Sequence, residues 1–487
     1  MVAGGTGAVL TGAAMLLLPL LGPGAGGPDR SGGPPPAAGP AGRAMTAAAT
    51  GARAALTDLT ALIDDRESWL RAHPRDAAAP AAWAVLGSAY VQRGLLSGDP
   101  AAYPRAQRAL DRSLAARPAG RGNTAAQLGL GALAGARGDF ATAKRWGETV
   151  RKREPANAAV YPVLIEAYLG LGELPAAGTA AERLRELRPG APALGLTARV
   201  HWARGWREDA LARAREAVAS AGTPAEKAGG LQALGEMAWE RGEPAEAVGW
   251  YDAALAAVPG HPPSLAGRAR ALVALGRTAG ALRDYSAALA AQPLARYALE
   301  LGELYASLDR GAEADAWYAT VRERAAAAAR NGADETLTLA RYEADHGDPD
   351  TAVTALRAAW DGGRRTAETA DALGWALYRA GAAKEALPFA RRAVDQGQRS
   401  ARFPYHLGMI ERELDQAGPA RRHLAEALRI HPDFSPLWAP EAREVLEALG
   451  EPSEGGPPTA APTAPAAGKP PTGKPPADPP AKPATGN

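Results

Sequence analysis

Residues 83–94 read WAVLGSAYVQRG, in which Trp83, Leu86, Gly87, Tyr90 and Gly94 follow the spacing W-x-x-L-G-x-x-Y-x-x-x-G. Apolar residues three and four positions apart lie on one face of a helix. Glycine commonly ends a helix because it adopts left-handed backbone conformations readily. This stretch therefore predicts an amphipathic helix that is followed by a turn.

Similar units follow this stretch with a period of about 34 residues. Each unit predicts two amphipathic helices joined by a turn, and a proline often follows the second helix, where it ends the helical segment. The array covers residues 80–432 and contains ten units. All ten share an alanine in the second helix: Ala106, Ala143, Ala177, Ala210, Ala247, Ala281, Ala314, Ala352, Ala386 and Ala420.

This tenfold pattern resembles the tetratricopeptide repeat family. The resemblance implies an all-α fold, a right-handed superhelical solenoid of stacked helix-turn-helix repeats. Small residues such as Gly87 and Ala106 would let the two helices of a repeat approach closely. A single helix pair cannot bury its apolar face alone, so each repeat depends on stacking against its neighbours.

The composition agrees with this fold and excludes several classes of function. Hydrophobic residues make up 46% of the chain and aromatic residues only 6%, so the apolar content is mostly alanine and leucine, as in helical proteins. The absence of cysteine excludes disulfides, thiolate catalysis and cysteine-ligated metal sites. The formal net charge of +2 gives no electrostatic reason to expect nucleic-acid binding.

Shifts in composition predict six segments along the chain. They are a signal peptide or membrane anchor (1–28), a Gly/Pro/Ala-rich linker (29–51), an N-terminal capping helix (52–79), the repeat array (80–432), a C-terminal capping helix (433–450) and a disordered proline-rich tail (451–487).

The first segment carries no charged residue from position 2 to 28, and residues 8–21 are its most apolar part. This length fits the core of a signal peptide better than the roughly 20 residues that span a bilayer. We therefore expect an extracytoplasmic protein, secreted or membrane-anchored, with a cytoplasmic location as the alternative because no basic residue precedes the apolar run. The sequence leaves open whether the segment is cleaved or kept as a membrane tether.

No motif in the sequence indicates catalysis. His346 has no second histidine four residues away, and neither a Walker motif nor a G-x-S-x-G nucleophile motif occurs. We predict that the protein is not an enzyme and holds no cofactor or metal. His73, His261 and His431 each precede a proline at an expected helix end, where imidazoles can bind the last helical carbonyls.

The resemblance also implies a concave groove, lined by the first helices of the repeats, that binds a protein or peptide. In the family's usual groove positions, the charge alternates from the third to the eighth repeat: Glu166, Arg199, Glu236, Arg270, Glu303 and Arg341. We expect neighbouring members to form ion pairs. Exposed pairs contribute only about 0–1 kcal/mol each, so the ladder would deter non-specific binding more than it stabilises the fold. The family's carboxylate-clamp members use lysine and asparagine here, so recognition of a chaperone tail of that kind is not expected.

Large aromatic residues lie on the same predicted face: Trp202, Trp239, Trp375, Tyr378 and Tyr405. Two placements are open, because the rings can project into the groove as anchors for a partner or turn sideways into the core between repeats. The favoured function is a non-enzymatic scaffold that holds a partner protein or peptide segment in its concave groove, outside the cytoplasm. The alternative is a cell-envelope carbohydrate or small-ligand binder in which the same rings stack on the ligand.

Overall fold

The computed structural model describes residues 39–50 and 54–450. Within these ranges the chain forms 23 α-helices, one short 3-10 helix and no β-strand, which confirms the predicted all-α fold. The predicted signal segment (1–28) and the predicted tail (451–487) lie outside the described residues, so neither prediction is tested. No helix in the described part combines the length and the apolar character that crossing a bilayer requires.

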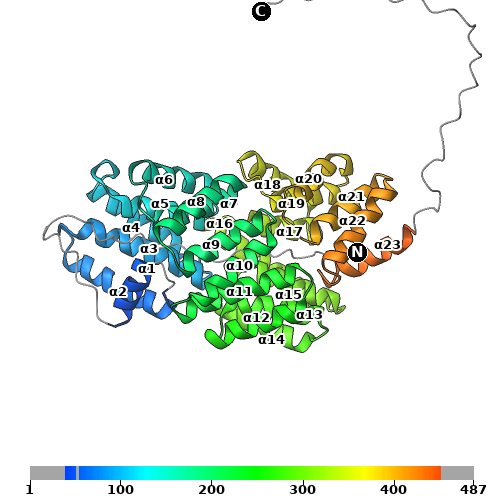
Figure 1. The fold of residues 1–487 in the computed structure, drawn as a ribbon, viewed down its shortest axis with the longest axis horizontal. Coiled ribbons are helices and arrows are strands. Elements are labelled where there is room, and N and C mark those ends of the chain that lie inside the picture. Colours follow the sequence, from blue (N-terminus) through cyan, green and yellow to red (C-terminus); the bar gives the residue numbers. More distant parts are fainter. Residues whose placement is uncertain (1–38, 51–53, 451–487) are drawn as a thin grey trace, which may run out of the picture. The chain divides into compact units, whose positions relative to one another are not determined.

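Ten consecutive helix pairs between Ala79 and Ile430 confirm the predicted repeats (Figure 1). The first five pairs are α3 (Ala79–Ser97) with α4 (Ala102–Ala116), α5 (Thr124–Ala136) with α6 (Phe140–Arg153), α7 (Val160–Leu171) with α8 (Leu174–Leu187), α9 (Ala191–Ala203) with α10 (Arg207–Ala219), and α11 (Pro224–Glu240) with α12 (Pro244–Ala257). The last five are α13 (Pro262–Ala274) with α14 (Thr278–Ala291), α15 (Ala295–Ser307) with α16 (Gly311–Arg330), α17 (Thr336–His346) with α18 (Pro349–Asp361), α19 (Ala367–Arg379) with α20 (Ala383–Asp395), and α21 (Arg402–Glu413) with α22 (Ala417–Ile430). The short 3-10 helix η1 (Ala119–Arg121) joins the first pair to the second.

Local sequence explains where many of these helices begin. The side chains of Asp139 and Thr223 accept hydrogen bonds from backbone amides in the first turns of α6 and α11. Asn123 does the same for α5, and its amide group also donates to the carbonyl of Arg117 at the end of α4 (2.8 Å). Asn123 thus fastens the end of one repeat to the start of the next.

Small residues set the distance between the two helices of a repeat. The ten shared alanines of the second helices are at most 3% exposed. A Cβ atom added to Gly235 would lie 2.6 Å from the ring of Tyr251, and one added to Gly302 would lie 2.6 Å from the ring of Tyr318. Glycine in the first helix therefore makes room for an aromatic ring of the second, which buries the ring without a cavity.

Helices also cover both ends of the array. The predicted N-terminal capping helix is α2 (Leu56–Ala72). Before it, α1 (Pro40–Thr50) occupies residues for which we had expected a linker. Its small side chains Ala41 and Ala44 are buried, and Arg43 pairs with Asp58 of α2 (2.7 Å), so even an alanine-rich stretch finds enough contact to be helical. At the other end, α23 (Trp438–Ala448) lies within 433–450, the segment predicted as a C-terminal capping helix.

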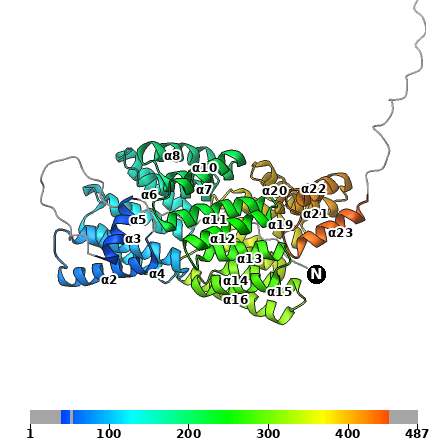
Figure 2. The ribbon, with the colours of Figure 1, turned by 60° about the horizontal axis from the view of Figure 1, so that its bottom comes forward.

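Neighbours in the sequence are neighbours in space throughout the array (Figure 2), but a second set of contacts joins residues that are far apart. Nε2 of Gln292 donates to the carbonyl of Leu95 (2.8 Å), 197 residues away, and Arg207 donates to the carbonyl of Arg399 (3.3 Å), 192 residues away. Two backbone hydrogen bonds of this kind join 334 to 137 (2.9 Å) and 365 to 171 (3.3 Å).

We call this line of contacts the seam. It joins the turns of the first five repeats to segments of the second half of the array: 95–98 to 292–294, 137–138 to 332–334 and 364, 171–172 to 363–366, 205–207 to 397–399, and 239–242 to 430–432. The array therefore closes on itself, a property that the repeat pattern did not predict.

Candidate functional site

The repeats surround a partly open cavity of about 500 Å³. Its lining comes from helices of the first nine repeats and from seam residues such as Gly138 and Arg364. The walls mix apolar side chains, among them Phe140, Leu169 and Leu299, with charged ones. A cavity of this size and mixed polarity is typical of a binding site, and we call it the interior cavity.

Six of the eleven predicted groove residues line the interior cavity. These are Glu166, Arg199, Trp202, Glu236, Arg270 and Arg341. Glu303 and Trp375 line a separate small cavity of about 20 Å³, to which Arg341 also contributes. Trp239, Tyr378 and Tyr405 line neither of these two cavities.

The alternating charges form ion pairs at two places in the ladder. Arg199 donates to both carboxylate oxygens of Glu166, one of them at 3.1 Å. Arg270 donates to Glu236 at 2.6 Å, and Tyr251 donates to the second oxygen of that carboxylate at 2.8 Å. Each pair joins two consecutive repeats.

The other steps of the predicted ladder are not ion pairs in the described part of the chain. They are Arg199 with Glu236, Arg270 with Glu303, and Glu303 with Arg341. Arg270 instead reaches a second carboxylate, that of Glu300, at 3.7 Å. Burial by itself would lower the pKa of Arg270, but the carboxylates of Glu236 and Glu300 raise it well above its usual value, so this guanidinium stays charged.

Further charged residues of the interior cavity escaped the sequence analysis. Arg296 and Glu300 lie four positions apart on α15, and Glu335 precedes α17. Burial raises the pKa of Glu335. The spacing of Arg296 and Glu300 is an i,i+4 pattern that could have been noticed in the sequence. Glu335 gave no such signal, because it lies between helices, where no helical spacing marks it.

Arg341 stands out because it borders both cavities. Its Nη2 atom is buried and has no hydrogen-bond partner within the described residues. Burial and the neighbouring charge of Arg402 lower the pKa of Arg341 to about 9, so the group remains protonated at neutral pH. An unsatisfied buried donor is costly, and a ligand oxygen in the interior cavity would satisfy it.

The small cavity is surrounded by a buried polar cluster. Asp371 accepts hydrogen bonds from Nε of Arg402 (3.1 Å) and from Nδ1 of His406 (2.8 Å). The ring of Trp375 stacks on His406 with 4.0 Å between centroids, and its Nε1 donates to Asp345 (2.7 Å). Burial raises the pKa of Asp345 to about 6. Asp345 and Asp371 thus find their hydrogen-bond partners within the last repeats.

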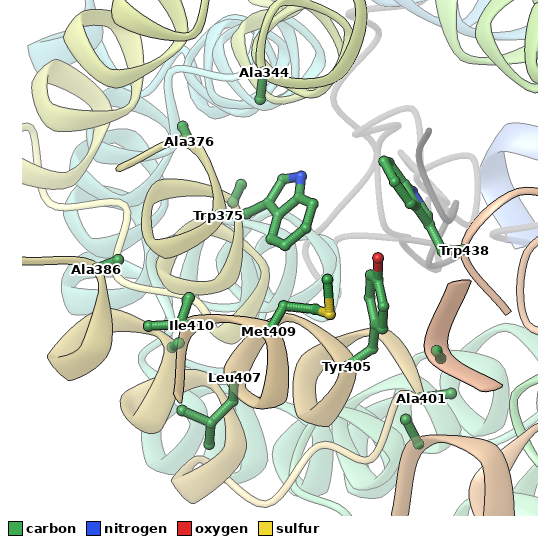
Figure 3. Packing of buried hydrophobic residues seen from close by; sticks show 14 of the residues in the cluster. Ala344, Trp375, Ala376, Ala386, Ala401, Tyr405, Leu407, Met409, Ile410 and Trp438 are labelled. Carbon is green, nitrogen blue, oxygen red and sulfur yellow. The ribbon is translucent and has the colours of Figure 1, made fainter. Parts of the chain in front are cut away.

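The aromatic residues take the second of the two placements that the sequence left open. Trp202, Trp239, Trp375 and Tyr405 are each at most 4% exposed, and Tyr378 is half-buried. Figure 3 shows Trp375, Tyr405 and Trp438 converging from α19, α21 and α23. The centroid of Trp438 lies 5.7 Å from that of Trp375 and 5.9 Å from that of Tyr405. Trp202 borders the interior cavity but is almost fully buried, so these rings do not form an open aromatic groove.

The three histidines that precede prolines have different environments. Nδ1 of His73 lies 3.0 Å from the carbonyl of Trp69, as expected at a helix end. His261 instead contacts the hydroxyl of Ser264 at 2.8 Å. His431 is buried in the seam, where its ring meets the edge of Trp239 at 4.3 Å. Burial lowers the pKa of His431 to about 3, so it is neutral in the folded protein.

Comparison with known proteins identifies the repeats. The family model of the tetratricopeptide repeat matches residues 196–262 and 337–401, which fall on two separate stretches of the array. These two stretches are tetratricopeptide repeats, as the sequence pattern predicts. Such repeats generally mediate protein–protein interaction or scaffolding, and folds of this type are typically non-enzymatic. No curated protein sequence matches this chain significantly.

Several solved structures are similar to this chain. The Cut9–Hcn1 hetero-tetramer of APC/C matches 85% of this chain and 84% of its own, with 14% identity and a TM-score of 0.40. A tetratricopeptide repeat protein from Parabacteroides merdae matches 53% of this chain and 98% of its own, with 18% identity and a TM-score of 0.32. MamA matches 33% of this chain and 92% of its own, with 22% identity and a TM-score of 0.27.

Proposed function

We propose that the protein is a non-enzymatic scaffold that holds an extended segment of a partner protein in its interior cavity. The cavity itself carries the proposal, because nine successive repeats contribute to its lining and one occupant could contact many of them. Its walls offer apolar contacts and charged groups side by side, which is what a polypeptide with mixed side chains needs.

Two features supply specificity in this proposal. The paired charges Glu166–Arg199 and Glu236–Arg270 present fixed polar groups at known places along the cavity. Arg341 offers a free guanidinium donor, which would bind a carboxylate or a backbone carbonyl of the partner segment. Stacking of a sugar on Trp239 or Trp375 finds no support, because both ring systems are buried between repeats.

We further propose that the protein acts outside the cytoplasm, secreted or tethered to the membrane by its N-terminal segment. The proposal rests on the uncharged, apolar character of residues 8–21. N-terminal sequencing of the mature protein, together with cell fractionation, tests it. An intact N-terminus in a cytosolic fraction would overturn it.

A photo-crosslinking amino acid at Leu169, inside the cavity, tests the scaffold proposal. We expect it to capture a protein in cells of the source organism. The same amino acid at Arg215, which is exposed on α10, should not capture that protein. The Arg341→Gln variant should reduce capture at Leu169 while the helical circular dichroism spectrum stays unchanged. Equal capture at both positions, or capture at Arg215 alone, contradicts binding in the interior cavity.

A further inference from the structure

A second pocket, of about 470 Å³, lies between α2, α3 and α4. It shares no lining residue with the interior cavity. One part of its wall is apolar and includes Leu70, Pro74, Trp83 and Leu86. The other part is basic, and its residues are Arg71, Arg105, Arg108 and Arg112. We call it the outer pocket.

The basic wall has little acidic compensation. Within the described residues, Arg105, Arg108 and Arg112 form no ion pair, although ion pairs of helix-surface arginines are common elsewhere in the array. The nearest acidic residue on the same helix, Asp111, accepts a hydrogen bond from Gln107 (3.0 Å) instead. Glu67, the one acidic residue of the lining, accepts from the hydroxyl of Tyr90 and lies 3.8 Å from Arg71. The outer pocket therefore carries a net positive charge.

An aromatic ring lies beside this charge. The guanidinium of Arg112 lies over the ring of Trp83, 4.7 Å from its centroid. This cation–π contact holds the arginine against the apolar wall, so the pocket places a fixed positive group next to a half-buried indole. A ligand for such a pocket needs both negative charge and an apolar group.

The spacing of the arginines favours an extended ligand over a single small anion. Arg105, Arg108 and Arg112 follow one another on the exposed face of α4. At about 1.5 Å of rise per residue, they are separated along the helix by about 4.5 and about 6 Å. Same-side residues of an extended peptide repeat about every 6.6 Å. A row of three cations over about 10 Å thus matches alternate acidic side chains of a peptide, whereas one phosphate could meet only part of it.

We infer that the outer pocket binds an acidic, extended peptide segment of a partner protein, with its carboxylates on Arg105, Arg108 and Arg112 and an apolar side chain against Trp83. This site is independent of the interior cavity, so the two proposals stand or fall separately. The attraction is electrostatic and exposed to solvent, so binding weakens as salt is added.

The probe for this inference is a short fluorescein-labelled peptide of alternating glutamate and alanine with one central leucine. Its fluorescence anisotropy is titrated with the full-length chain at low and at physiological salt. The doubly substituted Arg105→Glu, Arg108→Glu variant should bind about tenfold more weakly or worse, because two attractions become repulsions. Both positions are exposed, so the variant should keep its helical circular dichroism spectrum and its unfolding midpoint.

The matched control is Arg215→Glu with Arg283→Glu, which makes the same change of net charge at exposed positions of α10 and α14. Binding by this control should stay within about twofold of the wild type, since no outer-pocket residue changes. Equal weakening by both variants would mean non-specific attraction and would overturn the inference. The inference also fails if the wild type does not bind the peptide. Displacement by inorganic phosphate at constant ionic strength would equally overturn it, because it would show a site for a single small anion.

Discussion

The inter-helix turns of the first five repeats differ from those of the last five in what lies next to them. A Cβ atom added at Gly205 would lie 2.1 Å from the carbonyl oxygen of Gly397, across the seam. The same atom at Gly381, which has nearly the same backbone conformation (φ 80° against 78°), would meet nothing within 4 Å. The two turns have the same local shape, but only the first one is packed against another part of the array.

The residues found in these turns follow that difference. The left-handed turn position is glycine in each of the first five repeats: Gly98, Gly138, Gly172, Gly205 and Gly242. In the seventh and tenth repeats it is Asp309 and Asp415, the only non-glycine residues with positive φ in the described part of the chain. An aspartate in the left-handed backbone conformation lowers the free energy of unfolding by about 1 kcal/mol, a cost that a turn without packed neighbours tolerates. At Gly172, Gly205 and Gly242 a Cβ atom would lie within 2.6 Å of a backbone oxygen across the seam, so only glycine fits there.

The sharpest test of this comparison places the aspartate of the open turns into a seam turn. We expect Gly381→Asp to lower the free energy of unfolding by about 1 kcal/mol. Gly205→Asp should cost about 3 kcal/mol or more, because the side chain must also push Gly397 away and open the seam. Urea unfolding followed by circular dichroism measures both. Equal costs would show that the seam does not constrain the turn.

Acid should open the seam through His431. Its pKa is about 3 in the folded chain and about 6.5 when unfolded, so the unfolded state binds the proton more readily. The stability that neutral His431 contributes is complete above pH 6.5 and falls by about 1.4 kcal/mol per pH unit below it. At about pH 4.5 the loss reaches about 2 to 3 kcal/mol.

The variant His431→Asn removes this titration and keeps an acceptor near the amide of Asp433, which His431 holds at 3.1 Å. The free energy of unfolding of this variant should therefore fall less steeply below pH 6.5 than that of the wild type. Above pH 7 the two curves of unfolding free energy against pH should run parallel. Profiles that stay parallel down to about pH 4.5 would contradict the role of His431 in acid opening.

Ion pairs provide a third comparison of the two regions. Arg364 lies in the seam, where it donates to the carbonyl of Gly138 (2.9 Å) and pairs with Asp334 (2.5 Å), and its side chain is 15% exposed. Arg357 pairs with Glu385 on the open surface and is 42% exposed. We expect Arg364→Ala to cost about 1.5–3 kcal/mol and Arg357→Ala no more than about 1 kcal/mol. A larger cost for Arg357→Ala in urea unfolding would reverse the ranking of seam and surface.

The smallest effect should come from the open turns that already lack glycine. Asp309→Gly relieves the left-handed strain but increases the freedom of the unfolded chain, and these two effects nearly cancel. We expect a change in the free energy of unfolding within about 0.5 kcal/mol. A stabilisation well beyond this range would mean that strain at Asp309 is greater than an open turn allows.

The candidate site was only partly predictable. The register of the repeats anticipated the ion pairs of Glu166 with Arg199 and of Glu236 with Arg270 across consecutive repeats, while their part in partner binding stays a prediction. It did not show that Trp239 would turn toward His431, because that contact joins the fifth repeat to the end of the tenth. Nor did it predict the helix α1, where alanine side chains pack in a stretch that reads as a linker.

The sequence by itself determined the helix pairs, their number and the small residues between them, because those features depend on contacts between residues close in the chain. Only the tertiary structure decided the seam, the interior cavity and the burial of the aromatic rings. The physical reason is that each repeat adds a small rotation to the one before it. The sum of these rotations, which no single repeat encodes, brings Gly205 against Gly397 and leaves Gly381 open.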